Sequence, residues 1–153
     1  MRFDQRNYVP CIAMPPLYIG NSNNRFFGFD ERKDRNGNIV CGFFVDVETY
    51  DEKHVVTILC KPHVHCILWT DEHGRIEEAT VMRQQNHPEI PAALTLLVEN
   101  SDLKEWFLYN SGGIFDGSRD IIKHYQIWST EDCIDVLCEK EPMLFEEMKF
   151  EYE

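Results

Sequence analysis

The sequence predicts an α+β fold, a mainly antiparallel β-sheet with about two helices packed on one face. Runs rich in β-branched and aromatic residues follow one another at short intervals in the first half of the chain, which is typical of an antiparallel meander. Near residue 90 the apolar residues change to a helical period, and strand-like runs return after Gly112 and Gly113. No repeat or linker divides the 153 residues, so we expect a single domain, 1–153.

The first half of the chain contains the predicted hairpins. Residues 1–25 are expected to form an irregular lead-in, because prolines and an asparagine-rich run disfavour a strand ladder. The pair Asn36-Gly37 predicts a tight turn between a strand that begins near Phe26 and a second strand over Ile39–Glu48. Three more strands are expected, at residues 54–60, 63–70 and 75–83.

The second half of the chain contains the predicted helices. The first has Pro91 in its first turn and apolar residues at positions 90, 94, 97 and 98. The second is capped by Ser101 and ends at Gly112. Beyond it we expect a strand over 125–128. Residues 131–138 fit a helix or a strand, and we favour a strand that forms a hairpin turning at 130–132. Alternation of apolar residues over 143–153 favours a final edge strand, with a frayed helix as the alternative.

The composition is that of a folded protein outside the membrane. Hydrophobic residues make up 43% of the chain, which is too many for a disordered acidic segment. No apolar run reaches the roughly 18 to 20 residues of a membrane span, and the N-terminal residues do not resemble a signal peptide, so we expect a cytoplasmic protein without membrane association. The six cysteines are thinly spread, which favours free thiols over disulfides.

The charge is concentrated in one half of the molecule. Residues 1–75 carry 9 basic and 10 acidic residues, whereas residues 76–153 carry 6 and 17. The net charge of −12 therefore divides into −1 and −11. A concentration of like charge creates a local field that attracts molecules of opposite charge, so the second half favours a basic partner.

A cluster of thiols and imidazoles marks residues 60–66. Cys60, His63, His65 and Cys66 are all possible zinc ligands. On a regular strand, however, the two histidines would face one side and the two cysteines the other. We interpret the four residues as half-buried strand residues and expect neither a metal nor another cofactor.

The segment Phe43 to Thr49 resembles the first acidic motif of the proofreading-type 3′ to 5′ exonucleases. The resemblance implies that Asp46 and Glu48, two apart on a strand, would hold the metal ions that activate water for phosphodiester cleavage. Asn110 to Asp116 is similar to the second motif of that family but two residues too long, and the third motif is missing. No other catalytic motif is present, neither a nucleophile elbow, nor a P-loop, nor a zinc-protease motif.

The last third of the chain combines acidic and apolar residues. Residues 131–153 contain nine acidic residues against two lysines, a net charge of −7. Aromatic and Met residues are interleaved with these acids, a composition that recurs at protein interfaces. The predicted partner-binding residues, with Trp128 and Phe145 as apolar anchors, are Trp128, Glu131, Asp132, Asp135, Glu139, Glu141, Phe145, Glu146 and Glu147.

These features favour a stoichiometric inhibitor of the immunity or antitoxin type. A toxin that acts on nucleic acid must present a basic groove, which an acidic protein can block without binding nucleic acid itself. The first alternative is the metal-dependent exonuclease that uses Asp46 and Glu48. The second is a viral or accessory antagonist that mimics the charge of nucleic acid. The sequence leaves these alternatives, and the oligomeric state, open.

Overall fold

The computed structural model describes residues 5–11, 22–49, 54–86 and 94–149. Its two helices are α1 (Ile76–Asn86) and α2 (Asp102–Asn110). Short 3-10 turns occupy Glu72–Arg75 and Asp116–Ser118. The strands are β1 (Asn7–Pro10), β2 (Ser22–Lys33), β3 (Ile39–Thr49), β4 (His54–Cys60), β5 (Val64–Asp71), β6 (Leu94–Glu99), β7 (Lys123–Trp128), β8 (Asp132–Cys138) and β9 (Met143–Lys149).

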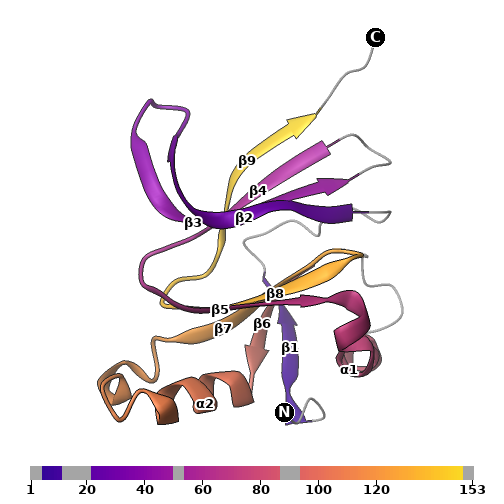
Figure 1. Ribbon diagram of the computed structural model, residues 1–153, viewed down its shortest axis with the longest axis vertical. Coiled ribbons are helices and arrows are strands. Elements are labelled where there is room, and N and C mark those ends of the chain that lie inside the picture. The colour runs from indigo at the N-terminus through magenta and orange to yellow at the C-terminus, as the bar shows by residue number, and fades with distance from the viewer. Residues whose placement is uncertain (1–4, 12–21, 50–53, 87–93, 150–153) are drawn as a thin grey trace.

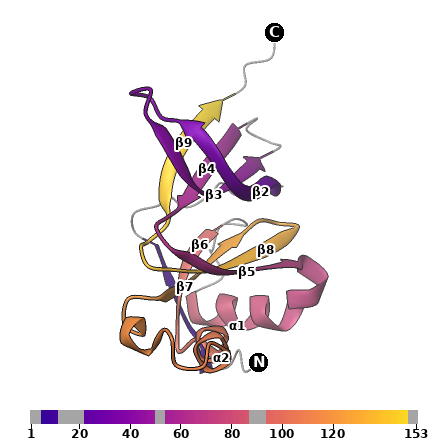
Figure 2. The same ribbon diagram turned by 60° about the vertical axis from the view of Figure 1, so that its left-hand side comes forward.

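The strands form two antiparallel sheets, which confirms the α+β class and its mainly antiparallel character. One sheet has the order β1-β6-β7-β8-β5 and the other the order β2-β3-β4-β9. The two sheets lie face to face, and both helices lie on the far side of the five-stranded sheet (Figure 1, Figure 2). The molecule therefore has three layers, where the sequence had indicated one sheet and its helices.

The main core lies between the two sheets. It contains alternate residues of β3 and β4 on one side and of β7 and β8 on the other, among them Val45, Ile58, Ile127 and Ile134, each with 0% exposure. Smaller apolar clusters lie between the five-stranded sheet and each helix. The five-stranded sheet is thus covered on both faces, and its inner strands β7 and β8 are buried almost throughout.

Several predicted elements are confirmed. The β2–β3 hairpin turns at Asn36-Gly37, where Gly37 has a φ of 80° and Asp34 Oδ1 accepts hydrogen bonds from the backbone of Asn36 and Asn38. Ser101 caps α2, with its Oγ accepting a hydrogen bond from the backbone N–H of Lys104 at 3.0 Å. The β7–β8 hairpin forms where expected, and β9 is an edge strand of its sheet.

The strand predicted over 75–83 is wrong, because this segment forms the end of a 3-10 turn and then α1. The residues that face the sheet are Arg75, Glu78 and Met82, which have helical spacing. Two of these three are charged, so a search for apolar periodicity does not find the helix.

The helix predicted around residues 90–98 is also wrong where the structure describes it, since 94–99 form β6. Both faces of β6 are covered, which makes it a continuous apolar run that periodicity does not separate from a helix. The described part of the lead-in 1–25 contains strands, so it is not irregular throughout. Asn7–Pro10 pairs with β6, β2 begins at Ser22 rather than near Phe26, and residues 1–4 and 12–21 of the lead-in lie outside the described residues.

Candidate functional site

The predicted partner-binding residues lie in two different environments. Trp128, Asp132 and Asp135 are buried in the five-stranded sheet, at 7%, 8% and 1% exposure. Glu139 and Phe145 are half-buried, and the exposed members are Glu131, Glu141, Glu146 and Glu147. The structure therefore does not bring the nine residues together on one surface.

Asp132 is held by contacts within the chain. Its Oδ1 accepts hydrogen bonds from Ser129 Oγ at 2.7 Å and from Asn24 Nδ2, and its Oδ2 accepts one from Trp69 Nε1 at 2.7 Å. The contact with Asn24 joins the five-stranded sheet to β2 of the other sheet, whereas the contact with Trp69 joins β8 to the edge strand β5 of the same sheet. Both oxygens are thus occupied by contacts within the chain.

Glu78 of α1 is the centre of a buried polar network on the helix side of the five-stranded sheet. Its side chain is fully buried. Its Oε1 accepts hydrogen bonds from Arg6 Nη1 at 2.6 Å, Tyr8 Oη at 2.9 Å and Gln126 Nε2 at 2.7 Å, and its Oε2 accepts one from Arg75 Nη1 at 2.6 Å. A buried carboxylate requires partners of this kind, because an unpaired charge in the interior is costly.

Asp135 of β8 is the second carboxylate of the network. Its Oδ2 accepts a hydrogen bond from Arg75 Nη2, and its Oδ1 contacts His124 Nε2 at 2.6 Å and Gln126 Nε2 at 3.0 Å. Burial by itself raises the pKa of Asp135, but the hydrogen bond from His124 and the charges of His124 and Arg75 outweigh it and hold the pKa below its ordinary value. Asp135 is therefore an ionised interior group.

The network continues to the start of α2. Arg6 Nε donates a hydrogen bond to Asp102 Oδ1 at 2.6 Å, so three carboxylates face two guanidinium groups. Burial alone would lower the pKa of Arg75, but the surrounding negative charges, those of Asp135 and Glu78 among them, raise it. These ion pairs tie the segment just before β1 to α1, β8 and α2.

Sequence reasoning missed Arg6, Arg75 and Glu78 as members of this network. The available signal was the alternation of polar side chains on β7, where His124 and Gln126 lie on the face opposite to the apolar core. The same alternation is typical of a strand with one face in solvent, so by itself it does not reveal a buried polar layer.

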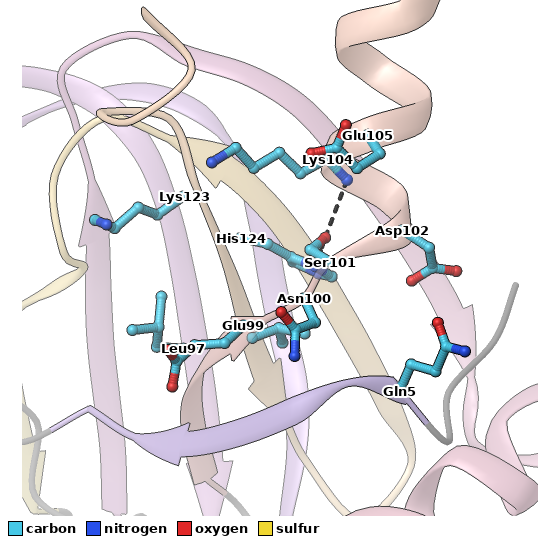
Figure 3. Close-up of a pocket in the computed structure, with 11 residues that line it drawn as sticks. Gln5, Leu97, Glu99, Asn100, Ser101, Asp102, Lys104, Glu105, Lys123 and His124 are labelled. Atoms are coloured by element: carbon cyan, nitrogen blue, oxygen red, sulfur yellow. Dashed lines mark hydrogen bonds between the residues drawn. The ribbon is translucent and has the colours of Figure 1, made fainter.

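A hollow of about 590 Å³ lies over the start of α2. Figure 3 shows Ser101 at its centre, between His124 and the backbone nitrogen of Lys104, with the Lys104 side chain extending toward the side where Lys123 lies. Burial lowers the pKa of Lys104, and the like charge of Lys123 lowers it further. The hollow thus has a serine, an imidazole and two amines on its walls.

Ser101, His124 and Asp135 are linked in series like a serine-hydrolase triad, but the two imidazole nitrogens have exchanged partners. Ser101 Oγ is 2.7 Å from His124 Nδ1, and His124 Nε2 is 2.6 Å from Asp135 Oδ1. The requirements of a nucleophile are not met, however. Ser101 is only 6% exposed and its Oγ accepts the hydrogen bond that caps α2, while Asp135 is already paired with Arg75. These contacts are those of a cap that anchors a helix to a sheet.

The predicted acidic contacts that are exposed or half-buried lie mostly on β9 and in its connection to β8. Glu146 and Glu147 are on β9, and Glu139 and Glu141 lie in the connection. Glu131 lies apart, in the β7–β8 turn. β9 also exposes apolar residues, at 38% for Met143, 37% for Leu144 and 43% for Met148.

Phe145 is directed to its own sheet. Its ring meets that of Phe44 edge-on, with the ring centroids 5.1 Å apart. The contact occurs where the ladder between β4 and β9 shifts register. Phe145 therefore secures the edge strand, and it is less available to a partner than the neighbouring Met residues.

Asp46 and Glu48 lie on one face of β3, as the exonuclease resemblance requires, but Asp46 is occupied. Arg32 donates two hydrogen bonds to its carboxylate, at 2.8 and 3.0 Å, and Thr57 Oγ1 donates a third at 2.6 Å. The Arg32 guanidinium also lies 4.6 Å from the centre of the Phe44 ring. Among the residues that the structure describes, no three His, Cys, Asp or Glu side chains form a group that could hold a metal ion.

The thiols and imidazoles of residues 60–66 do not converge. Cys60 lies in the core between the sheets, whereas Cys66 packs on the side of α2. His63 Nε2 and His65 Nε2 are 3.8 and 3.6 Å from Glu139 Oε2. All six cysteines are free thiols, as predicted.

Comparisons with known proteins do not assign this chain to a family. No family model, curated protein or solved structure matches it. In the described part of the chain, no helix has the length and apolar character needed to cross a membrane.

Proposed function

We propose that the protein is a stoichiometric inhibitor that binds a basic protein through β9 and the acidic residues beside it. The observation that carries this proposal is the position of β9 at the edge of its sheet, with exposed Met and Glu side chains along it. An exposed edge strand can accept contacts from another chain, and acidic residues favour a partner of opposite charge.

Two properties of β9 support a role in binding. Its exposed apolar side chains, Met143, Leu144 and Met148, offer surface that loses water when a partner binds. Methionine also adapts to different partner surfaces. Glu146 and Glu147 lie between them and supply charge that accelerates encounter with a basic surface. Binding of this kind weakens as salt increases, because exposed charges are screened.

The class of partner follows from chemistry. A protein that cleaves or binds nucleic acid carries a basic groove for the phosphates, and an acidic protein can occupy that groove. We therefore favour a nucleic-acid-targeting toxin as the partner, in the manner of an immunity protein or antitoxin. An antagonist that mimics nucleic acid would use the same surface, and the identity of the captured partner separates the two.

The test is capture of the partner from the native source at low salt, followed by binding kinetics with the purified pair. We expect a basic protein that is released at high salt and whose activity on nucleic acid stops when the complex forms. Replacing Glu146 and Glu147 by Lys should slow association by about ten-fold or more and reduce its dependence on salt.

A matched control is Glu77→Lys, which reverses an exposed acid on α1, in the layer of the molecule remote from β9. It should leave the association rate nearly unchanged. Equal effects of the β9 and α1 variants would show that only the net charge matters and would reject β9 as the contact. A partner that remains fully active in the complex would reject inhibition.

A further inference from the structure

The opposite edge of the four-stranded sheet is formed by β2, and its surface differs from that of β9. β2 is 12 residues long and exposes three phenylalanines, at 41% for Phe26, 39% for Phe27 and 68% for Phe29. In the described part of the chain it pairs only with β3. A long edge strand with exposed aromatic residues and no proline is a template for pairing with another strand.

The charge on β2 permits contact with a second copy of the same chain. Ser22–Lys33 contains three basic and two acidic residues, a net charge of +1 in a protein with a net charge of −12. Most of the negative charge belongs to the second half of the chain. The β2 strand therefore carries no net negative charge that would oppose the approach of a second β2.

Symmetry restricts the ways in which two copies of β2 can pair. Two identical antiparallel strands related by a two-fold axis must place one residue opposite its own copy. We propose that two copies of the protein pair through β2 with Gly28 opposite Gly28, which joins the two four-stranded sheets into one sheet of eight strands.

This register is supported by the residue pairs that it creates. Phe27 of each copy lies opposite Phe29 of the other, and Arg25 of each copy lies opposite Glu31 of the other. Aromatic pairs and opposite charges both stabilise neighbouring strands. Each pair occurs twice because of the symmetry.

The neighbouring registers are less favourable. A centre at Phe29 places Arg25 opposite Lys33, which opposes like charges, and places Phe27 opposite Glu31. A centre at Phe27 places Arg25 opposite Phe29 and loses the ion pair. Only the centre at Gly28 combines the aromatic and the charged pairs.

The structure of β2 fits this role at three positions. β3 has no residue opposite Arg25, because the ladder shifts register there, and the Arg25 side chain is exposed. Glu31 is exposed as well. Gly28 lies at the centre, where the absence of a side chain lets the two backbones approach closely.

The first test is sedimentation of the purified protein over a range of concentrations. We expect a monomer–dimer equilibrium that Glu31→Arg weakens by about ten-fold, because Arg25 then faces an arginine in both copies. The double variant Arg25→Glu with Glu31→Arg should restore the dimer, since it exchanges the two charges. Glu77→Arg on α1 is the control and should have no effect.

The second test reports the register directly. Residues opposite each other in an antiparallel pair have Cα atoms about 4.5–5.5 Å apart, which is within reach of a disulfide. In a Cys41→Ser background, which removes the exposed native thiol, Gly28→Cys should form a covalent dimer on oxidation. The new Cβ lies 3.3 Å from the end of the exposed Phe26 ring, which can move aside.

The control for the register is Asp30→Cys in the same background, because residue 30 lies opposite Phe26 and should not cross-link. A protein that stays monomeric at the highest soluble concentration overturns the proposal. So does a dimer that neither the charge variants nor Gly28→Cys affects, because its contact must then lie elsewhere. Neither result bears on the binding of a basic partner at β9.

Discussion

β8 and β9 follow each other in the chain and have similar compositions, yet they occupy opposite environments. Both mix acidic with apolar residues. All seven residues of β8 are buried, because β8 lies inside the five-stranded sheet with the second sheet on one face and the helices on the other. Within the part of the chain that the structure describes, β9 has one neighbour, β4, and exposes Met and Glu side chains.

The difference shows that an acidic residue has a role that depends on the layer in which its strand lies. Asp135 on β8 is an interior ion that orders Arg75 and His124, whereas Glu146 and Glu147 on β9 are exposed to solvent. We expect the first to contribute to the free energy of unfolding, and we propose that the others act on encounter with a partner. Substitutions that separate these two effects test the comparison.

The largest expected effect is that of Asp135→Ala. It leaves the buried guanidinium of Arg75 without one of its two carboxylate partners and removes the acceptor of His124. Removing one member of a buried ion pair destabilises a protein by about 3–5 kcal/mol. Urea unfolding of the variant measures the loss. A loss below about 1 kcal/mol would contradict the role assigned to the network.

Asp132→Ala should have a smaller effect. It removes the acceptor of three hydrogen bonds, from Ser129, Asn24 and Trp69, at a site that retains 8% exposure. Water can replace part of what is lost, so we expect a destabilisation of about 1–3 kcal/mol. Urea unfolding gives the value, and tryptophan fluorescence should report the release of Trp69.

The contribution of Asp135 should also depend on pH. The pKa of Asp135 in the folded protein lies below its ordinary value of 3.8. The ionised carboxylate therefore stabilises the folded protein fully above about pH 4, and this stabilisation is lost as the pH falls toward the pKa of the folded state. The stability difference between the wild type and Asp135→Asn should therefore shrink as pH decreases below about 4. Unfolding curves across this range measure it.

A non-titrating variant on the same strand provides the control for pH. Ile134→Val removes one methylene group from the core between the sheets. We expect it to lower the free energy of unfolding by about 0.5–1.5 kcal/mol. Its difference from the wild type should stay constant over the same pH range. A constant difference for Asp135→Asn as well would show that Asp135 is not ionised in the folded protein.

The smallest effect on stability is expected on β9. Replacing Glu146 and Glu147 by Gln should change the free energy of unfolding by no more than about 0.5 kcal/mol, because both side chains are exposed. The same variant should weaken the salt dependence of partner binding. A large loss of stability would place these residues among the structural ones and remove the contrast between the two strands.

Elements with strong local signals could be predicted from the sequence. The turn at Asn36-Gly37 and the cap at Ser101 depend on residues within a few positions, and both are confirmed. α1 could not be found in this way, because the buried residues at its start, Arg75 just before the helix and Glu78 within it, are charged and have partners far away in the chain. The same distance explains why Asp135 was grouped with the surface acids.

The amino-acid sequence by itself determined the α+β class, the antiparallel hairpins and the concentration of negative charge in the second half, since these follow from local spacing and composition. Only the tertiary structure decided which acids are interior ions and which face solvent. Burial depends on the strand order β1-β6-β7-β8-β5 and on the layers that cover it, and contacts between residues remote in the chain set both.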